Sequence, residues 1–417
     1  MEQAFRSVPN ALLGGTRLLN RPILTNNHNA GTWIRSARKT ALTITAKRSL
    51  VTLLLVTMLW CAIGQQSARP TFAAYTGNHL RVGISFGNTL LSMTDDQLAE
   101  ALDDVVDTGA RWIRFDMSWS DVQPTSAQAY VWRPFDRIIA QAHRRQLNVL
   151  PIIAYTPPWA RPAGCFNLFC APADPSEFAA FAGAAAKRYS QSGAHTWEIW
   201  NEPNYIHFWQ PSPDPVAYTR LLKATCAAIR KADTQAFVLM GGLGIAETVA
   251  GNISIADFLS QPGESPLRLV DALAVHPYTF PYPASRLGPW ANPSLPADSG
   301  LPYLRQVLAK SGTPNLPIWI TEYGAPTGGS GPAWDGSPDP LGTEPDHVTE
   351  AQQAAMATDA IVTAKSEPII GSLFWYTYRD FASPADSVES YFGITRVDGS
   401  KKPVFAALTH AVKGLIR

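Results

Sequence analysis

The sequence has few charged residues, few cysteines and no internal repeat. Charged side chains make up only 16% of its 417 residues, whereas 46% are hydrophobic, which is enough for one large core. No coiled-coil pattern or low-complexity domain appears in it. No candidate strand is followed by a glycine-rich phosphate loop, and this absence weakens the case for an open, doubly wound sheet.

Cysteine occurs at only four positions, and their spacing does not suit a zinc site. Cys165 and Cys170 bracket a short loop, but no second pair with His or Cys spacing accompanies them. In an oxidising compartment we expect these two residues to form a disulfide, worth about 2 kcal/mol by the chain-entropy estimate. Cys226 lies in a helical pattern and is interpreted as a buried thiol, and Cys61 lies in an apolar run.

Charge is unevenly distributed along the chain. Residues 1–48 hold eight basic residues and one acidic residue, residues 49–68 hold no charge, and from Ala74 onward there are 25 basic and 32 acidic residues. This order predicts a basic leader at 1–48, a signal-peptide core or uncleaved membrane anchor at 49–74, and one folded domain at 75–417. We expect a secreted or extracytoplasmic protein, and the acidic remainder argues against nucleic acid as a partner.

From Arg81 onward, short β-rich runs alternate with amphipathic stretches. We predict strands at Val82–Phe86, Trp112–Phe115, Asn148–Ile153, Thr196–Trp200, Phe237–Met240, Ala272–His276, Ile318–Thr321 and Ser372–Tyr376. We predict helices at Thr94–Thr108, Phe135–Arg145, Pro175–Tyr189, Val216–Lys231, Ile255–Leu259, Leu301–Lys310, Thr349–Lys365 and Pro403–Leu415. Thr94 and Gln97 have the spacing of a capping box, and Gly109 ends that helix.

This alternation predicts an α/β fold with a parallel sheet, and eight repeats predict closure into a (β/α)8 TIM barrel. Two Pro- and Gly-rich stretches, Pro281–Gly300 and Thr327–Asp346, are interpreted as insertions on its active face. In such barrels, reactive groups lie at the C-terminal ends of the strands. Two glutamates, an arginine, a histidine, a tyrosine and several indoles occupy those ends here.

Two carboxyls flanking a bond, one protonated and one ionised, are what glycosidic cleavage requires. The leaving oxygen is a poor leaving group until it is protonated, and the second carboxylate must stay charged to attack or stabilise an oxocarbenium-like centre. Arg114 beside one of the carboxyls would keep that group ionised. No cluster of His and Asp with ligand spacing appears at the strand ends, so we expect no metal and no cofactor.

Five segments resemble clan A glycoside hydrolases, in particular families 5 and 39. They are Trp197–Asn204 (WEIWNEPN), Trp319–Gly324 (WITEYG), His276–Phe280 (HPYTF), Ser372–Asp380 (SLFWYTYRD) and Tyr391–Leu408 (YFGITRVDGSKKPVFAAL). The NEP triplet alone is a weak signal, but the ordered set is specific. The resemblance covers about residues 82–417.

The resemblance implies that Glu202 is the acid/base and Glu322 the nucleophile of a retaining hydrolase. It further implies that Asn201 bonds the sugar 2-hydroxyl and that Tyr278 bonds the nucleophile. We also expect His276 in the site.

Two further roles follow from the resemblance: Trp375 would floor the subsite of the reacting sugar, and Arg114 would orient the nucleophile. Several family members have a histidine at the end of the third strand, where this chain has Tyr155 and Trp159. That departure leaves the subfamily open.

Other candidates are compatible with a structural role as well. Trp119, Trp159 and Trp209 are as suited to the core as to sugar stacking, and we include them as candidate substrate-binding residues. Glu198 lies four residues before Glu202 on the same strand, about 13 Å deeper, and is interpreted as a buried, paired structural carboxylate.

Two aspartates, Asp116 and Asp380, are expected to brace loops. The overall prediction is a monomeric retaining hydrolase of β-linked poly- or oligosaccharide, with its two carboxyls about 5–5.5 Å apart. One alternative is a catalytically inactive carbohydrate-binding protein on the same scaffold. Another is a transglycosylase, or an enzyme that trims the cell's own exopolysaccharide.

Overall fold

The computed structural model describes residues 80–291, 300–337, 345–382 and 387–415. Eight parallel strands form a closed barrel in the order β1 to β8, with β8 pairing back onto β1. The strands are Arg81–Ser85, Trp112–Ser118, Asn148–Ala154, Thr196–Asn201, Phe237–Gly244, Leu273–His276, Ile318–Tyr323 and Ile370–Tyr376. The predicted TIM barrel is therefore confirmed, and the open-sheet alternative is wrong.

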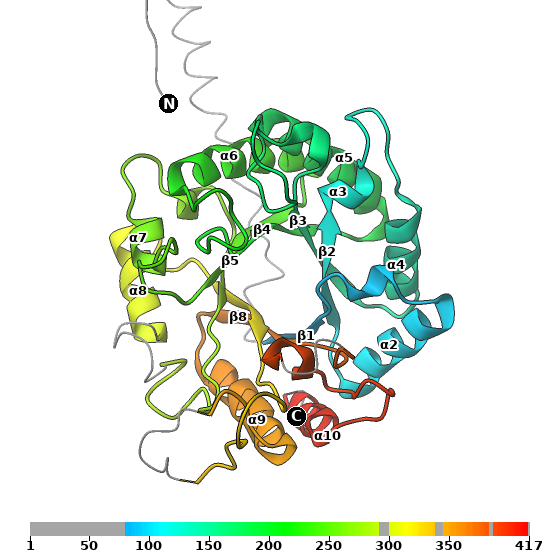
Figure 1. Cartoon of the computed structure of the whole chain (residues 1–417), viewed down its shortest axis with the longest axis vertical. Helices are drawn as coiled ribbons and strands as arrows, with labels where there is room; N and C mark the ends of the chain where they lie inside the picture. Colours follow the sequence, from blue (N-terminus) through cyan, green and yellow to red (C-terminus); the bar gives the residue numbers. More distant parts are fainter. Residues whose placement is uncertain (1–79, 292–299, 338–344, 383–386, 416–417) are drawn as a thin grey trace, which may run out of the picture. The chain divides into compact units, whose positions relative to one another are not determined.

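Helices surround the ring of strands (Figure 1). They are α2 (Asp95–Thr108), α3 (Trp119–Val122), α4 (Arg133–Arg144), α5 (Pro175–Tyr189), α6 (Pro215–Ala232), α7 (Ile255–Leu259), α8 (Leu301–Lys310), α9 (Glu350–Ser366) and α10 (Pro403–Lys413). Short 3-10 turns occupy Thr89–Leu91, Pro158–Ala160, Ser190–Ser192, Pro266–Arg268 and Val388–Tyr391.

The helix ends follow from local sequence. Thr94 and Gln97 form the predicted reciprocal capping box at the start of α2, and Gly109 closes the helix in the left-handed conformation, with φ of 86°. The predicted bounds of α5, α7 and α8 agree with the structure residue by residue. The short helix α3 was not predicted, and the other helices differ from their predicted bounds by one or two residues at an end.

An apolar cluster fills the end of the barrel where several strands begin. It consists of Trp112, Leu150, Phe237, Leu239, Ala272, Ala274, Trp319 and Phe374. The Trp112 and Trp319 rings meet edge to face, with centroids 5.5 Å apart. Polar side chains of the strands consequently gather toward the opposite, C-terminal end.

The predicted disulfide between Cys165 and Cys170 is present, and Cys226 is buried in α6. In the described part of the chain, no helix combines the length and apolar character that crossing a membrane requires. The predicted leader at 1–48, the apolar segment at 49–74 and Cys61 lie outside the described residues.

Candidate active site

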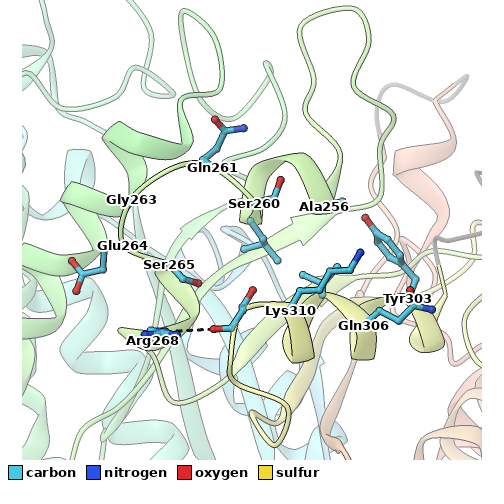
Figure 2. A pocket seen from close by; sticks show the side chains of 13 residues that line it. Ala256, Ser260, Gln261, Gly263, Glu264, Ser265, Arg268, Tyr303, Gln306 and Lys310 are labelled. Atoms are coloured by element: carbon cyan, nitrogen blue, oxygen red, sulfur yellow. Dashed lines mark hydrogen bonds between the residues drawn. The ribbon is translucent and has the colours of Figure 1, made fainter.

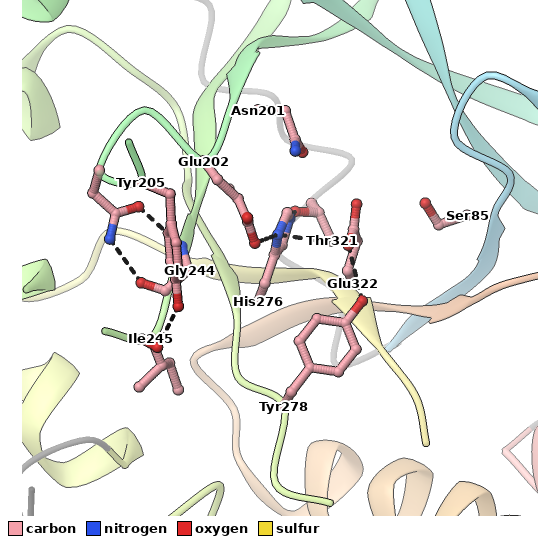
Figure 3. Close-up of polar contacts among 12 residues, drawn as sticks. Ser85, Asn201, Glu202, Tyr205, Gly244, Ile245, His276, Tyr278, Thr321 and Glu322 are labelled. Atoms are coloured by element: carbon pink, nitrogen blue, oxygen red, sulfur yellow. Dashed lines mark hydrogen bonds and ion pairs between the residues drawn. The ribbon is translucent and has the colours of Figure 1, made fainter. Parts of the chain in front are cut away.

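A cavity of about 840 Å³ opens at the C-terminal ends of the strands. Glu202, Glu322, Asn201 and Tyr278 all line it, from β4, β7 and the segment after β6. Figure 3 shows the two glutamates on either side of His276, with Tyr278 below Glu322. The structure thus brings the principal predicted residues to one place.

His276 joins the two glutamates. Its Nδ1 is hydrogen-bonded to Oε1 of Glu202 at 2.8 Å and lies 3.7 Å from Oε2 of Glu322. Since both distances start from one atom, those two oxygens are at most 6.5 Å apart. The glutamate side chains remain 15% and 14% exposed, whereas the imidazole is fully buried. Both carboxyls are therefore open to a ligand, and a buried group sets their spacing.

Arg114 forms the base of the site and is fully buried. It donates through Nη1 to Glu322 and to the Ser85 hydroxyl, and through Nη2 to Oδ1 of Asn201 at 3.0 Å. Two further donations, at 2.7 and 3.0 Å, reach the carboxylate of Glu198. This bidentate pair fixes the guanidinium plane of Arg114. It therefore also fixes the direction of the hydrogen bond from Arg114 to Glu322.

Glu198 is the buried, paired carboxylate that the sequence predicted. Its Oε1 also accepts from the backbone N–H of Gly242 at 2.8 Å and from the Thr321 hydroxyl at 3.2 Å. Its acceptor sites are thus occupied by protein donors, and Glu198 is not among the residues that line the cavity.

We expect Glu198→Ala to destabilise the protein by about 3–5 kcal/mol, because it leaves part of a buried guanidinium uncompensated. Denaturant unfolding monitored by fluorescence measures the change. The control is Glu264→Ala, which removes an exposed partner of Lys223 and should cost less than about 1 kcal/mol. Equal stability of the two variants would show that the Arg114–Glu198 pair adds nothing to the fold.

The environment of Glu322 favours its charged form. Burial raises the pKa of this carboxyl, but the electrostatic effects of His276 and Arg114 and the hydrogen bonds from Arg114 and Tyr278 outweigh it. The net pKa lies below the usual glutamate value. The Tyr278 hydroxyl donates at 2.9 Å, and burial and the charge of Glu322 raise the pKa of the phenol, so it stays protonated.

Tyr278→Phe is expected to move the acid limb of the kcat/KM profile to higher pH. The hydrogen bond from Tyr278 stabilises the carboxylate and lowers the pKa of Glu322, so its loss raises that pKa. Activity that needs charged Glu322 is then lost at a higher pH as acid is added. Initial rates from pH 3 to 8 measure the acid limb of the profile. An unmoved acid limb would contradict the expectation that Tyr278 stabilises the charged form of Glu322.

The end of β4 has an unusual backbone. Trp200 and Glu202 have positive φ angles, 72° and 42°, which cost non-glycine residues about 1–3 kcal/mol each. The Asn204 amide compensates by binding both the N–H and the C=O of Gly244 and the C=O of Ile253. The loop after β4 is thereby tied to the loop after β5, which holds Glu202 over the cavity.

Gly242 on β5 is required by the close approach of His276. A Cβ at this position would lie 2.1 Å from His276 Nε2. The Gly242 carbonyl also accepts from the backbone N–H of Glu202 at 3.0 Å. A residue without a side chain therefore sets the position of both the imidazole and the neighbouring carboxyl.

The four indoles proposed from the sequence as sugar-binding residues do not line the cavity. Trp119, Trp209 and Trp375 are at most 2% exposed, and the half-buried Trp159 packs edge-on against Trp119. Their faces are used in the core, where Trp209 contacts Trp200 and Tyr218. These predictions were wrong. A tryptophan in the core and a tryptophan that stacks on sugar are the same residue type, so the sequence alone does not distinguish them.

For Trp375 the error is one position along β8. Successive side chains of a strand point to opposite faces, and Trp375 packs against Tyr323 in the core. Tyr376 lines the cavity instead. The run of three aromatic residues at this strand end carried no signal to show which ring faces inward.

The two aspartates differ. Asp380 braces a loop as expected, since it pairs with Lys402 at 2.7 Å and accepts from the Gly393 N–H. Asp116 was expected to do the same but lines the cavity, beside Tyr155. Sequence reasoning missed Asp116 as a cavity residue, although it follows Arg114 by two positions and so shares its face of β2.

A second hollow, of about 660 Å³, lies between α7 and α8 (Figure 2). Two of its charged groups already have partners: Glu264 pairs with Lys223, and Arg268 donates to the Ser311 carbonyl. None of the residues predicted to carry chemistry lines it. The cavity at the strand ends is therefore the candidate active site.

The family model described as cellulase, glycosyl hydrolase family 5, matches residues 75–356, which is more than half of the chain. The chain belongs to glycosyl hydrolase family 5. A β-xylosidase from Geobacillus stearothermophilus is 27% identical to this family 5 hydrolase over 235 residues, covering 54% of the chain and 42% of the relative. The hydrolase thus matches less than half the length of that curated relative.

Solved structures share the fold of this glycoside hydrolase. A family 39 glycoside hydrolase from Bacteroides cellulosilyticus superposes with a TM-score of 0.61 at 21% identity, covering 80% of this chain and 64% of that one. A GH5_18 structure from Streptomyces cattleya in complex with GlcNAc has a TM-score of 0.59 at 19% identity, covering 81% and 80%. At such identities the likeness shows the fold alone.

Proposed function

We propose that this glycosidase is a retaining enzyme that cleaves β-linked poly- or oligosaccharides by double displacement. The observation that carries the proposal is that Glu202 and Glu322 share one cavity, with His276 holding two of their oxygens no more than 6.5 Å apart. Retaining enzymes place the two carboxyls about 5–5.5 Å apart, whereas inverting enzymes need about 6.5–9.5 Å to admit a water molecule.

In the first step, Glu322 attacks the anomeric carbon and the bond from that carbon to the leaving oxygen breaks. The leaving oxygen takes the proton of Glu202. We place that proton on Oε2 of Glu202, because Oε1 is already hydrogen-bonded to His276. In the second step, Glu202 removes a proton from water, the water oxygen bonds to the anomeric carbon, and Glu322 leaves as a carboxylate.

The surrounding residues suit this assignment. Arg114 and Tyr278 donate to Glu322, which supports its role as the ionised nucleophile. Asn201 presents its Oδ1 to Arg114, so its Nδ2 is left to donate to the 2-hydroxyl of a sugar in the cavity. Tyr376, rather than Trp375, offers an aromatic face to the reacting sugar.

The comparisons narrow the substrate to carbohydrate. One relative is described as a β-xylosidase and one structural neighbour contains GlcNAc, so we propose a β-linked substrate without choosing between these sugars. The alternative of an inactive binding protein predicts a missing carboxylate or a blocked mouth, and both glutamates line an open cavity here. Transglycosylation, or trimming of the cell's own polysaccharide, would use the same first step.

The test is a panel of β-glucans, mannans, xylans and aryl β-glycosides, followed by proton NMR of the first product formed. We expect a β-configured anomer before mutarotation. A first product of α configuration would mean inversion and would remove the nucleophile assignment. Transfer to an added sugar acceptor, measured in the same reactions, separates transglycosylation from hydrolysis.

We also propose that the enzyme acts outside the cytoplasm. The basic leader and apolar run of residues 1–74 and the Cys165–Cys170 disulfide support export. Intact mass of the mature protein separates a cleaved signal from a retained anchor. A full-length protein in the cytoplasmic fraction would contradict the proposal.

A further inference from the structure

Asp116 occupies a second level of the active site, above Arg114. The two residues share one face of β2, and Asp116 lies about 6.6 Å further toward the C-terminal end of the strand. Its backbone N–H donates to the Gly87 carbonyl at 2.9 Å, which fixes the strand end against the loop after β1. Asp116 lines the cavity together with Glu322, so it lies beside the proposed position of the reacting sugar.

Tyr155, at the end of β3, lines the same cavity as Asp116, and its hydroxyl lowers the pKa of this carboxyl. Its backbone has a φ of 71°, a conformation that is strained for a bulky residue and persists only where the surroundings impose it. The surroundings are aromatic: the Tyr155 ring packs against Phe169 at 5.5 Å and against Trp200 at 6.2 Å. Packing thus fixes the Tyr155 ring at the wall of the cavity that Asp116 also lines.

The carboxyl of Asp116 retains unused acceptor capacity. Within the described residues it forms no salt bridge, whereas Arg114 below it is occupied by Glu198, Asn201, Ser85 and Glu322. A carboxylate has about four lone-pair sites, each of which can accept a hydrogen bond from a sugar hydroxyl. Burial, which outweighs the charge of Arg114, raises the pKa of Asp116 to about 7.

The cavity as a whole is acidic. Among its described lining residues there is no lysine or arginine, but there are five carboxyls: Asp116, Asp121, Glu202, Glu322 and Glu389. Burial, and then the charges of Glu322 and Glu202, raise the pKa of Glu389, which shows that the negative charges act across the cavity. A sugar hydroxyl can donate to such groups, whereas a sugar carboxylate is repelled by them.

We propose that Asp116, positioned by Tyr155, is a specificity-determining residue that accepts hydrogen bonds from hydroxyls of the sugar beside Glu322 and makes the enzyme select neutral glycosides over uronides. This inference rests on the proposed glycosidase function and adds to it the class of sugar. Asp116 takes no part in proton transfer to the leaving group. Tyr155 acts through Asp116 and is a positioning residue.

The experiment compares two aryl glycosides: the neutral one that the wild type cleaves best, and the uronide of the same ring configuration. We expect the wild type to favour the neutral substrate at least 100-fold in kcat/KM. Asp116→Asn should lower kcat/KM for the neutral substrate at least tenfold and lower the neutral-to-uronide ratio at least tenfold. Tyr155→Phe should lower both quantities in the same direction by about threefold to tenfold.

The neutral-to-uronide ratio is the decisive readout. A general loss of folding lowers the kcat/KM of both substrates alike and leaves their ratio unchanged. Glu264→Gln removes one charge from the second hollow, between α7 and α8. It should leave the ratio and the kcat/KM of both substrates at wild-type values. An unchanged ratio in both Asp116→Asn and Tyr155→Phe, or a wild type that cleaves both substrates equally, overturns the inference. Either result leaves the proposed function standing, because that function is tested separately by cleavage of the panel and by the anomeric configuration of the first product.

Discussion

Glu322→Gln is expected to lower kcat by about five orders of magnitude while the protein stays folded. The amide has the shape of the carboxyl but cannot form the covalent bond to the anomeric carbon. Arg114 keeps Glu198, Asn201 and Ser85 as partners, so the base of the site should hold. Steady-state kinetics on an activated aryl glycoside, with thermal unfolding measured in parallel, tests this.

The matched control is Glu367→Gln, which also removes the charge of a glutamate that accepts from an arginine. Glu367 pairs with Arg305 outside the cavity, so its replacement should leave kcat unchanged. Glu322→Ala adds a positive test, because azide can enter the vacated space and attack the anomeric carbon. The product should then be an α-glycosyl azide. More than about 1% residual activity in folded Glu322→Gln would remove the nucleophile role.

The barrel was predictable from the sequence because the alternation of strands and helices follows from which residues must be buried. Each strand is buried on both faces and reads as a short apolar run, as in Asn148–Ala154 and Phe237–Gly244. Helix ends are encoded by short-range rules, such as the pairing of Thr94 with Gln97. Glu202 and Glu322, the proposed catalytic residues, were locatable for the same reason, since the fold brings strand ends to one mouth whatever the loops do.

The sugar-contacting surface was not predictable in the same way. Whether an aromatic residue faces the cavity or the core depends on one step of strand alternation, and Trp375 and Tyr376 differ by that step. Tyr155 lines the cavity beside Asp116 through a left-handed backbone that has no sequence signature in a non-glycine residue. Such features follow from tertiary packing, and local sequence rules do not contain them.

Glu202→Ala is expected to show a loss that depends on the leaving group. A sugar or alkyl alkoxide must be protonated as it departs, so removing the proton donor should cost about 1,000-fold or more in kcat/KM on such substrates. A dinitrophenolate leaves without a proton, so kcat/KM for its glycoside should fall less than about tenfold. The second step still lacks its base, and the glycosyl-enzyme should accumulate, which lowers both kcat and KM on the activated substrate.

The measurement is kcat/KM across a series of aryl glycosides of decreasing leaving-group pKa, together with mass spectrometry of the trapped glycosyl-enzyme. Azide should restore turnover of Glu202→Ala and give a β-glycosyl azide, the opposite anomer to that expected from Glu322→Ala. The two products distinguish the roles, because azide attacks the glycosyl-enzyme in Glu202→Ala and the bound substrate in Glu322→Ala. If Glu202→Ala were equally impaired on every leaving group, Glu202 would not be the proton donor. The two carboxyls beside His276 would then have no separate roles as acid/base and nucleophile.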